Sequence, residues 1–387
     1  MNQTTFPSNR MIPVNTPLLD GNEKQYLNEC IDSGWISSEG PFVKRFENEF
    51  ARVVDRKHAI ACANGSGALD IAVAAAGIGQ GDEVIMPTFT IISPAASVVR
   101  AGGVPVLVDS DPKTWNMDVS QMEERITAKT KAIIVVHVYG LPVDMDRVLD
   151  IANRYGLVVI EDAAEMHGQT VRGRPCGSFG AISTFSFYPN KHITCGEGGM
   201  VVTDNDTIAE KCQGLRNLCF QPHRRFVHEE LGWNYRMTNM QAAIGLAQLQ
   251  RLDSHVGRKR EIGQMYGERL SAIPELELPL SETDYAKNIY WVFGVVLSDS
   301  FQGTTQQVAE LLGQKKIGTR PFFWPMHWQP VFQKLGLFHD EHYPVAERMA
   351  RQGLYLPSGL GLANLEIEHV CVSLKAILND LTKSRTS

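Results

Sequence analysis

Short apolar runs alternate with longer amphipathic segments along the first half of the chain, from about His58 to Leu215. The short runs are rich in Val and Ile, as is typical of strands, and read HAIAC, DEVIMP, VPVLVD, KAIIVVHVYG and LVVIED. Between them, segments such as SGALDIAVAAAG and MDRVLDIANRYG repeat apolar residues at helical spacing. Strands that are apolar at every position belong to sheets covered on both faces. The pattern therefore predicts a mostly parallel α/β/α layer.

The pattern changes after Thr238, where a long helical period begins in TNMQAAIGLAQLQRL. It is followed by the strand-like NIYWVFGVVL, the helix-like TQQVAELLGQKK and a final helical segment, IEHVCVSLKAILNDL. We therefore predict two domains. A large α/β domain spans residues 12–250, and a linking helix with a smaller α+β domain spans residues 251–387. The N-terminal residues are expected to pack on the small domain.

Composition and charge narrow the class of partner. The formal net charge is -6 and the basic residues are scattered, which argues against nucleic acid or an anionic membrane. The seven cysteines include no CxxC pair and no histidine spacing suited to zinc, so we expect no metal and a reducing, cytoplasmic setting. No secretory leader is visible, and no apolar run approaches the roughly 18 residues of a membrane helix. A small-molecule partner is expected.

Candidate chemistry lies where strands end and helices begin, because open α/β sheets bind ligands at those junctions. In HAIACANGSGALDIA a strand ends near Cys62 and a helix begins near Ser66 or Gly67, so the free amides of that helix would hold a phosphate. The same Asn and Gly would also serve an ordinary turn. In LVVIEDAAEMHG a buried strand delivers Glu161, Asp162 and Glu165 to its end. Such acids either cap the next helix or stabilise a protonated ring nitrogen.

A lysine occupies the third junction. The stretch STFSFYPNKHITCGEGGMVVTD places Ser186 and Lys191 between two strand-like runs, beside glycines that allow close backbone approach. A loop lysine is ordinarily a solvated charge, but lysine also forms Schiff bases when burial or a neighbouring charge lowers its pKa. Together the three junctions would form one site for pyridoxal 5'-phosphate (PLP), with a phosphate anchor, a ring-nitrogen partner and a reactive lysine.

The sequence resembles the DegT/DnrJ/EryC1/StrS family of sugar aminotransferases from about Ile12 to Leu374. The resemblance rests on LDGNEKQYL, SGWISSEGPFVKRFE, GDEVIMPTFT, VHVYG, IEDAAE, FSFYPNKHITCGEGGM and NYRMTNMQAAIG. It implies the fold of aspartate aminotransferase (fold type I) and a PLP cofactor. It also implies L-glutamate as amino donor, a keto- or oxo-sugar as acceptor, and a homodimer with shared active sites.

The resemblance also implies roles for individual residues. Lys191 would bind the cofactor's aldehyde and transfer protons, Asp162 would pair with the pyridine nitrogen, and Glu165 would lie beside the ring hydroxyl. The residues implied to hold the phosphate are Gly65, Ser66, Ser186 and, from the neighbouring subunit, Asn234.

One position departs from the family pattern. Many relatives carry an aromatic residue, stacked on the cofactor, where this chain has Ile91. Ile91 would cover the ring by apolar contact instead, with Phe89 two residues away.

The segment IGTRPFFWPMHWQPVF, together with GWISSEG and GWNYRMTN, looks most like GDP-perosamine synthases, which aminate GDP-4-keto-6-deoxymannose. An arginine followed by aromatic residues suits a diphosphate and a base, although such aromatics would equally close a small core. An alternative acceptor is a sugar without a nucleotide, the 8-oxo-3,8-dideoxy-octulosonate that becomes 8-amino-3,8-dideoxy-octulosonate (Kdo8N) in some lipopolysaccharides. The candidate substrate-binding residues are Ser37, Arg236, Arg320 and His327.

Three other functions fit parts of the sequence. Relatives with histidine in place of the lysine act as sugar 3-dehydratases, so Lys191 favours transamination. A nicotinamide-dependent oxidoreductase is suggested by GIGQG, but its glycines lack the GxGxxG spacing and precede a strand. A non-catalytic regulator with the same fold is the third possibility. The presence of every chemical residue favours an enzyme.

Overall fold

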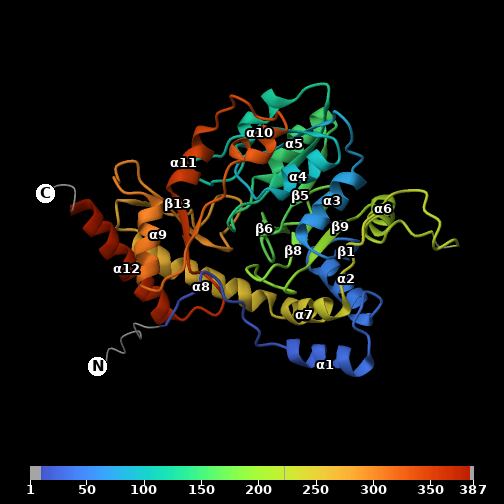
Figure 1. Ribbon diagram of the computed structural model, residues 1–387, viewed down its shortest axis with the longest axis horizontal. Coiled ribbons are helices and arrows are strands. Elements are labelled where there is room, and N and C mark those ends of the chain that lie inside the picture. The colour runs from blue at the N-terminus through green and yellow to red at the C-terminus, as the bar shows by residue number, and fades with distance from the viewer. Residues whose placement is uncertain (1–9, 222, 384–387) are drawn as a thin grey trace.

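Seven strands form the large sheet of the computed structural model, which describes residues 10–221 and 223–383 (Figure 1). Their order is β1-β9-β8-β5-β4-β2-β3. β9 runs antiparallel to both of its neighbours, and the other strand pairs are parallel. The prediction of a mostly parallel sheet is confirmed. The strand bounds are β1 His58–Cys62, β2 Glu83–Pro87, β3 Val104–Val108, β4 Thr130–Val136, β5 Val158–Asp162, β8 Ile182–Ser186 and β9 Gly199–Thr203.

Helices cover both faces of this sheet. Alternate strand residues enter two separate apolar clusters, as Ile60 and Ala61 of β1 do. One cluster is completed by α3, α4 and α6, and the other by α2, α5 and α7. Burial on both faces explains why the strands are apolar at successive positions. The helix bounds are α1 Glu23–Ser33, α2 Pro41–Val53, α3 Gly65–Ala75, α4 Ser93–Arg100, α5 Met145–Tyr155, α6 Asp206–Arg216 and α7 Asn239–Leu249.

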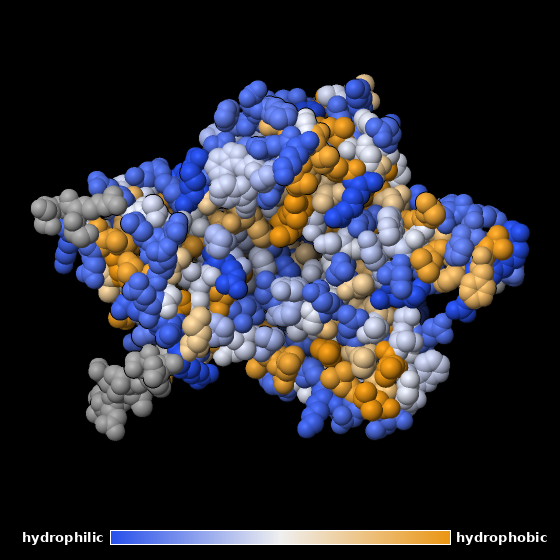
Figure 2. All heavy atoms as spheres, in the orientation of Figure 1, coloured by the Kyte–Doolittle hydropathy of each residue, from blue (hydrophilic) through white to orange (hydrophobic). Residues whose placement is uncertain are grey.

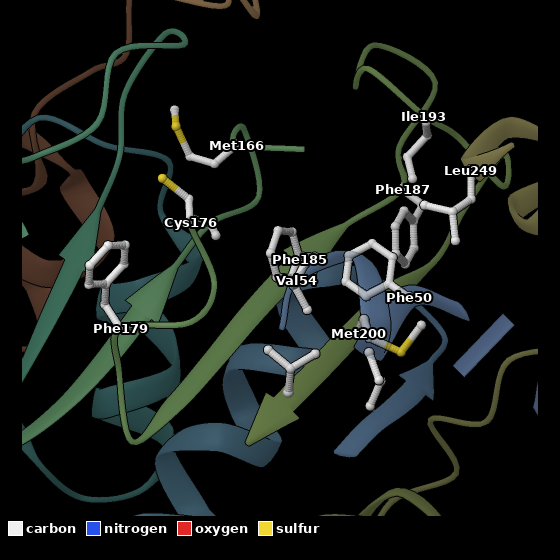
Figure 3. Close-up of a cluster of buried hydrophobic side chains, with 14 of the residues drawn as sticks. Phe50, Val54, Met166, Cys176, Phe179, Phe185, Phe187, Ile193, Met200 and Leu249 are labelled. Atoms are coloured by element: carbon white, nitrogen blue, oxygen red, sulfur yellow. The ribbon is translucent and has the colours of Figure 1, made fainter. Parts of the chain in front are cut away.

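An aromatic group fixes α2 against the strand that leads to the lysine loop. Phe50 of α2 meets Phe185 of β8 edge-on, with ring centroids 4.8 Å apart, and Phe187 at 5.3 Å (Figure 3). All three rings are buried. Aromatic pairs in this geometry stabilise a core by about 0.5–1.5 kcal/mol beyond the area they bury. The end of β8 is therefore held firmly where the chain turns toward Lys191.

The C-terminal part forms a smaller antiparallel sheet in the order β10-β11-β13-β12, covered by α8, α9 and α12. Ile12 pairs with Ile317 and belongs to the core of this sheet. Phe332 and Met349, in contrast, join an apolar cluster of the large sheet. The division at residue 250 falls between α7 and α8 and stays a prediction. The bounds are α8 Leu252–Leu270, β10 Leu276–Glu277, β11 Phe293–Leu297, α9 Thr305–Gln314, β12 Arg320–Pro321, α10 Pro330–Lys334, α11 Pro344–Gln352, β13 Gly353–Leu356 and α12 Asn364–Lys383.

Smaller elements complete the described chain. A two-stranded hairpin, β6 Thr170–Val171 with β7 Arg174–Pro175, lies between β5 and β8 in the sequence. Short 3-10 helices cover Val119–Gln121, Glu123–Arg125 and Met326–Trp328. Within the described ranges, none of the helices has the length and apolar character that crossing a membrane requires.

Candidate active site

The first wall of the site is the N-terminus of α3, which follows β1 after a short turn. The side chain of Asn64 caps the helix by accepting a hydrogen bond from the Gly67 amide at 2.8 Å. The first amides of a helix have no partner within it and carry partial positive charge. A Cβ added at Gly65 would lie 2.7 Å from the Cβ of Ser186, so glycine is needed where α3 meets the end of β8. This end suits a phosphate.

β5 and β8 are parallel neighbours, so their carboxyl ends meet beside this helix (Figure 1). Asp162 is the last residue of β5 and is 3% exposed. One of its oxygens accepts a hydrogen bond from the Ala164 amide at 3.1 Å. Burial raises the pKa of Asp162, because a charged carboxylate loses its hydration there. A cationic partner, such as a protonated ring nitrogen, would favour the charged form.

Lys191 follows β8 in a turn, and its amide donates to the carbonyl of Tyr188 at 2.9 Å. Its side chain is only 10% exposed, so it is not a surface charge. The amine lies 3.6 Å from a carboxylate oxygen of Glu165 and 3.7 Å from the centre of the Trp291 ring. Burial lowers the pKa of Lys191, which favours the neutral, nucleophilic amine.

Glu165 faces the same amine from the segment after β5. Burial raises the pKa of Glu165 to about 7, although Lys191 acts in the opposite direction. Its second oxygen accepts a hydrogen bond from the Tyr139 amide at 2.7 Å. Burial thus shifts the pKa of each partner toward its neutral form, and the charge of the other partner acts against that shift.

These groups line one cavity of about 620 Å³. Ile91 lines it, whereas Phe89 is fully buried behind it, against Tyr139 and Phe323. Of these two residues, which were expected to cover the cofactor ring, Ile91 lies at the cavity surface and Phe89 does not. The predicted residues that line the cavity are Gly65, Ser66, Ile91, Asp162, Glu165, Ser186 and Lys191.

Other predicted residues lie elsewhere in the single chain. Ser37 and Arg236 line a second cavity, of about 710 Å³, and Asn234 forms a β-bridge with Asn217, which also lines that second cavity. His327 is 2% exposed, and its ring nitrogens contact Thr88 and Glu347.

Arg320 is exposed on β12, directly opposite Tyr355, which lines the first cavity. The strand register therefore places Arg320, a predicted substrate-binding residue, next to a residue that lines the first cavity.

His137 and Trp291 are among the lining residues that the sequence did not predict. His137 follows the apolar run KAIIVV at the end of β4, and its Nδ1 accepts a hydrogen bond from the Val143 amide at 3.0 Å. Trp291 comes from the strand-like NIYWVFGVVL. The position of His137 at a strand end was a usable signal. Nothing local to Trp291 indicates that it meets a residue 100 positions earlier.

The cavity fits PLP. It joins a helix N-terminus, a buried acid and a lysine whose pKa is lowered by burial. Two buried side-chain oxygens at its wall, Thr184 Oγ1 and Asn190 Oδ1, have no hydrogen-bond partner within the described chain. Buried polar atoms without partners are uncommon and point to a bound group.

A family model matches residues 17–375, and its description is the DegT/DnrJ/EryC1/StrS aminotransferase family. The chain belongs to this family. Members are PLP-dependent sugar aminotransferases of fold type I, so the predicted fold, cofactor and transaminase class are confirmed. The two substrates are accordingly an amino donor and a carbonyl sugar.

Several curated proteins resemble this chain over nearly its whole length and nearly all of their own. GDP-perosamine synthase of Caulobacter vibrioides is 44% identical, over 95% of this chain and 98% of that protein. GDP-perosamine synthase of Escherichia coli O157:H7 is 41% identical, over 96% of this chain and 100% of that protein. Among solved structures, DesV of S. venezuelae in complex with a ketimine intermediate is 34% identical and superposes with a TM-score of 0.85. That match covers 92% of this chain and 94% of DesV.

Proposed function

We propose that this enzyme converts GDP-4-keto-6-deoxymannose to GDP-perosamine, with L-glutamate as the amino donor. The observation that carries the proposal is the cavity that joins Lys191, Asp162 and the α3 N-terminus in a chain 44% identical to a GDP-perosamine synthase. Identity of this degree over nearly the whole chain supports a shared substrate more strongly than a shared fold does.

The chain's own groups then take distinct roles. Asp162 would pair with the ring nitrogen of PLP, and Glu165 would lie at the ring hydroxyl, since both line the cavity. When bound, PLP would supply an electron sink for the charge that develops at the donor's α-carbon. The amides of Gly65 and Ser66 and the hydroxyl of Ser186 would hold the phosphate.

Lys191 moves the protons. In its neutral form, Nζ would take the proton from the α-carbon of glutamate in the first half of the reaction. In the second half it would deliver a proton to the former carbonyl carbon of the sugar, which becomes the carbon that bears the amine. The cavity walls formed by Trp291, Phe323 and Tyr355 exclude water from this transfer.

In this proposal Arg320 and Trp324 hold the nucleotide. Both are exposed, and Arg320 lies opposite Tyr355, which lines the cavity. A guanidinium binds a diphosphate through paired N–H donors, and an exposed indole offers a face for a base. These two residues extend the site from the sugar toward its nucleotide.

A second copy of the chain completes the site in this proposal. Apolar side chains gather over α1 and α7 and at the tip of the segment that projects after α6 (Figure 2). Exposed apolar residues on these parts include Ile31, Trp35, Phe226 and Leu231. Exposed apolar patches of this kind mark interfaces between subunits. In the homodimer, Asn234 of one subunit reaches the cofactor phosphate of the other.

The acceptor is tested by spectral cycling. The purified enzyme is first aminated with glutamate, which removes the absorbance of the lysine-bound cofactor, and is then presented with one sugar at a time. GDP-4-keto-6-deoxymannose is expected to restore the absorbance. Restoration by 8-oxo-3,8-dideoxy-octulosonate alone would replace the proposed acceptor with the sugar that lacks a nucleotide. Lys191→Ala is the control in which neither sugar gives a change.

A further inference from the structure

A short arm of the chain, residues 320–327, connects the small sheet to the large one beside the first cavity. It begins on β12, which belongs to the small sheet. Phe323 of this arm lines the cavity, whereas Arg320 and Trp324 are exposed. α10 follows the arm and packs into an apolar cluster of the large sheet through Phe332 (Figure 1). The placement of the arm therefore sets the placement of the three side chains it carries.

His327 fastens the end of this arm to the large sheet. The residue is 2% exposed, and its Nδ1 lies 2.9 Å from the hydroxyl oxygen of Thr88, which directly follows β2. The amide of Met326 donates to the carbonyl of the same Thr88, also at 2.9 Å. A main-chain bond and a side-chain bond thus join two segments that lie 239 positions apart in the sequence.

The second ring nitrogen fixes the tautomer of His327. Its Nε2 lies 3.3 Å from a carboxylate oxygen of Glu347 on α11, and an ionised carboxylate can only accept a hydrogen bond. The proton of the neutral ring is therefore on Nε2, and Nδ1 accepts from the hydroxyl of Thr88. Glu347 is held in turn by the Tyr343 amide at 3.1 Å and by Arg351 at 3.5 Å. Because these groups satisfy one another, they select one placement of the arm, which apolar packing alone would not specify.

We propose that His327 is a positioning residue for substrate binding, which fixes the arm that carries Arg320, Phe323 and Trp324 at the edge of the cavity. Its ring lies outside the lining of the first cavity, so it acts through the arm and not by the direct substrate contact that the sequence led us to expect. The inference rests on the proposed function, in which Arg320 and Trp324 hold the nucleotide.

The network lies apart from the groups that would hold PLP. Those groups come from α3, from β5 and β8, and from the segments that follow these two strands. The hydrogen bonds of His327 go to the end of β2 and to α11 instead. Loss of His327 is therefore expected to weaken binding of the GDP-sugar and to leave the glutamate half-reaction unchanged.

Four variants separate the contacts of the two ring nitrogens. His327→Leu removes both contacts and keeps an apolar side chain in the same buried place. His327→Asn keeps an amide near the position of Nδ1, within reach of Thr88, whereas His327→Gln keeps one near the position of Nε2, within reach of Glu347. Thr88→Val removes the hydroxyl from the other side of the contact. The matched control is Thr90→Val, because the Thr90 hydroxyl belongs to the same segment, is also buried and has no hydrogen-bond partner within the described chain.

The first measurement is the affinity of the PLP-loaded enzyme for GDP, by isothermal titration calorimetry. His327→Leu, His327→Gln and Thr88→Val should each weaken GDP binding roughly three- to tenfold, the range that corresponds to the loss of one hydrogen bond. The double variant of Thr88→Val with His327→Leu should bind no more weakly than His327→Leu, because both changes break the same contact. His327→Asn and Thr90→Val should bind GDP as the wild type does. In kinetics, the weakened variants should raise KM for the GDP-sugar and keep the wild-type rate of the glutamate half-reaction.

Hydrogen exchange of the arm is a readout that needs no ligand. The Met326 amide donates to Thr88, so peptides that cover the arm should exchange faster in His327→Leu and in Thr88→Val than in the wild type or in Thr90→Val. Circular dichroism and thermal melting identify which variants are folded. Should His327→Leu fail to fold, Thr88→Val and the comparison of His327→Asn with His327→Gln make the same test.

Wild-type GDP affinity and wild-type exchange in folded Thr88→Val would overturn the inference. Additive losses in the double variant, an equal loss in Thr90→Val or a glutamate half-reaction slowed as much as the sugar half-reaction would overturn it too, since each indicates a general structural role. A wild-type enzyme that binds no GDP would instead remove the proposed acceptor. Exchange of the arm in the variants then still decides whether His327 fixes it.

Discussion

Replacing Glu161 by glutamine is expected to destabilise the protein strongly, although the two side chains have nearly the same shape. Glu161 precedes Asp162 on β5 and is fully buried. One of its oxygens faces two donors and the other faces three. The donors are Gly177 N at 2.5 Å and His137 Nε2 at 3.2 Å on the first oxygen, and Phe179 N at 2.9 Å, Gly180 N at 3.2 Å and Ser183 Oγ at 3.1 Å on the second.

The magnitude follows from this count. A glutamine amide has one oxygen and one NH₂ group, so in either orientation its NH₂ faces at least two of these donors. Breaking a buried, hydrogen-bonded charge by changing one partner costs about 3–5 kcal/mol. Burial raises the pKa of Glu161, but its hydrogen bonds outweigh burial and hold the pKa below the ordinary 4.5. The stabilisation is therefore complete above pH 4.5 and is lost as the pH falls through the lower, folded-state value.

Urea unfolding at neutral and at acidic pH tests this prediction. The difference in unfolding free energy between wild type and Glu161→Gln should be large at neutral pH and should narrow in acid. The matched control is Glu123→Gln, because Glu123 is exposed and pairs with Arg154 at the surface, where ion pairs contribute little. A Glu161→Gln protein that unfolds with the wild-type midpoint at neutral pH would refute the reasoning.

Three further changes probe the cavity. Gly65→Ala places a Cβ 2.7 Å from that of Ser186 and should weaken PLP binding, measured by equilibrium dialysis, at least about tenfold. A tenfold change corresponds to roughly 1.4 kcal/mol of binding free energy. Gly79→Ala is the control and should retain PLP normally, because its Cβ meets nothing within 4 Å. Burial raises the pKa of Glu165 to about 7, so its titration should appear as a change near pH 7 in the pH–rate profile of the glutamate half-reaction, measured by stopped flow. Glu165→Gln should abolish that change. A profile that Glu165→Gln leaves unaltered would assign the change to another group. Arg320→Gln should raise KM for the GDP-sugar roughly tenfold or more with kcat little changed, in steady-state kinetics, and a loss confined to kcat would argue against nucleotide binding.

Several features could be read from short stretches of sequence. The apolar runs HAIAC and LVVIED correspond to β1 and β5. Of the residues expected at their ends, Gly65, Ser66, Asp162 and Glu165 line the cavity, whereas Glu161 does not. Those predictions succeeded because a parallel sheet brings the carboxyl ends of its strands to one edge, whatever their separation along the chain. The sequence does not predict the contact between Trp291 and Lys191. Trp291 reaches Lys191 from the C-terminal part of the chain, and no local pattern records that contact.

The sequence by itself determined which elements form and which chemical groups stand at their ends, since periodicity and turn residues act over a few positions. It also contains a lysine, an acid and a glycine turn in an order shared with one family of enzymes. Only the tertiary structure decided that the amine of Lys191 is buried and that its pKa is lowered. That pKa depends on desolvation, which lowers it, and on the charges of Glu165 and Asp162, which raise it, and packing between distant segments sets both.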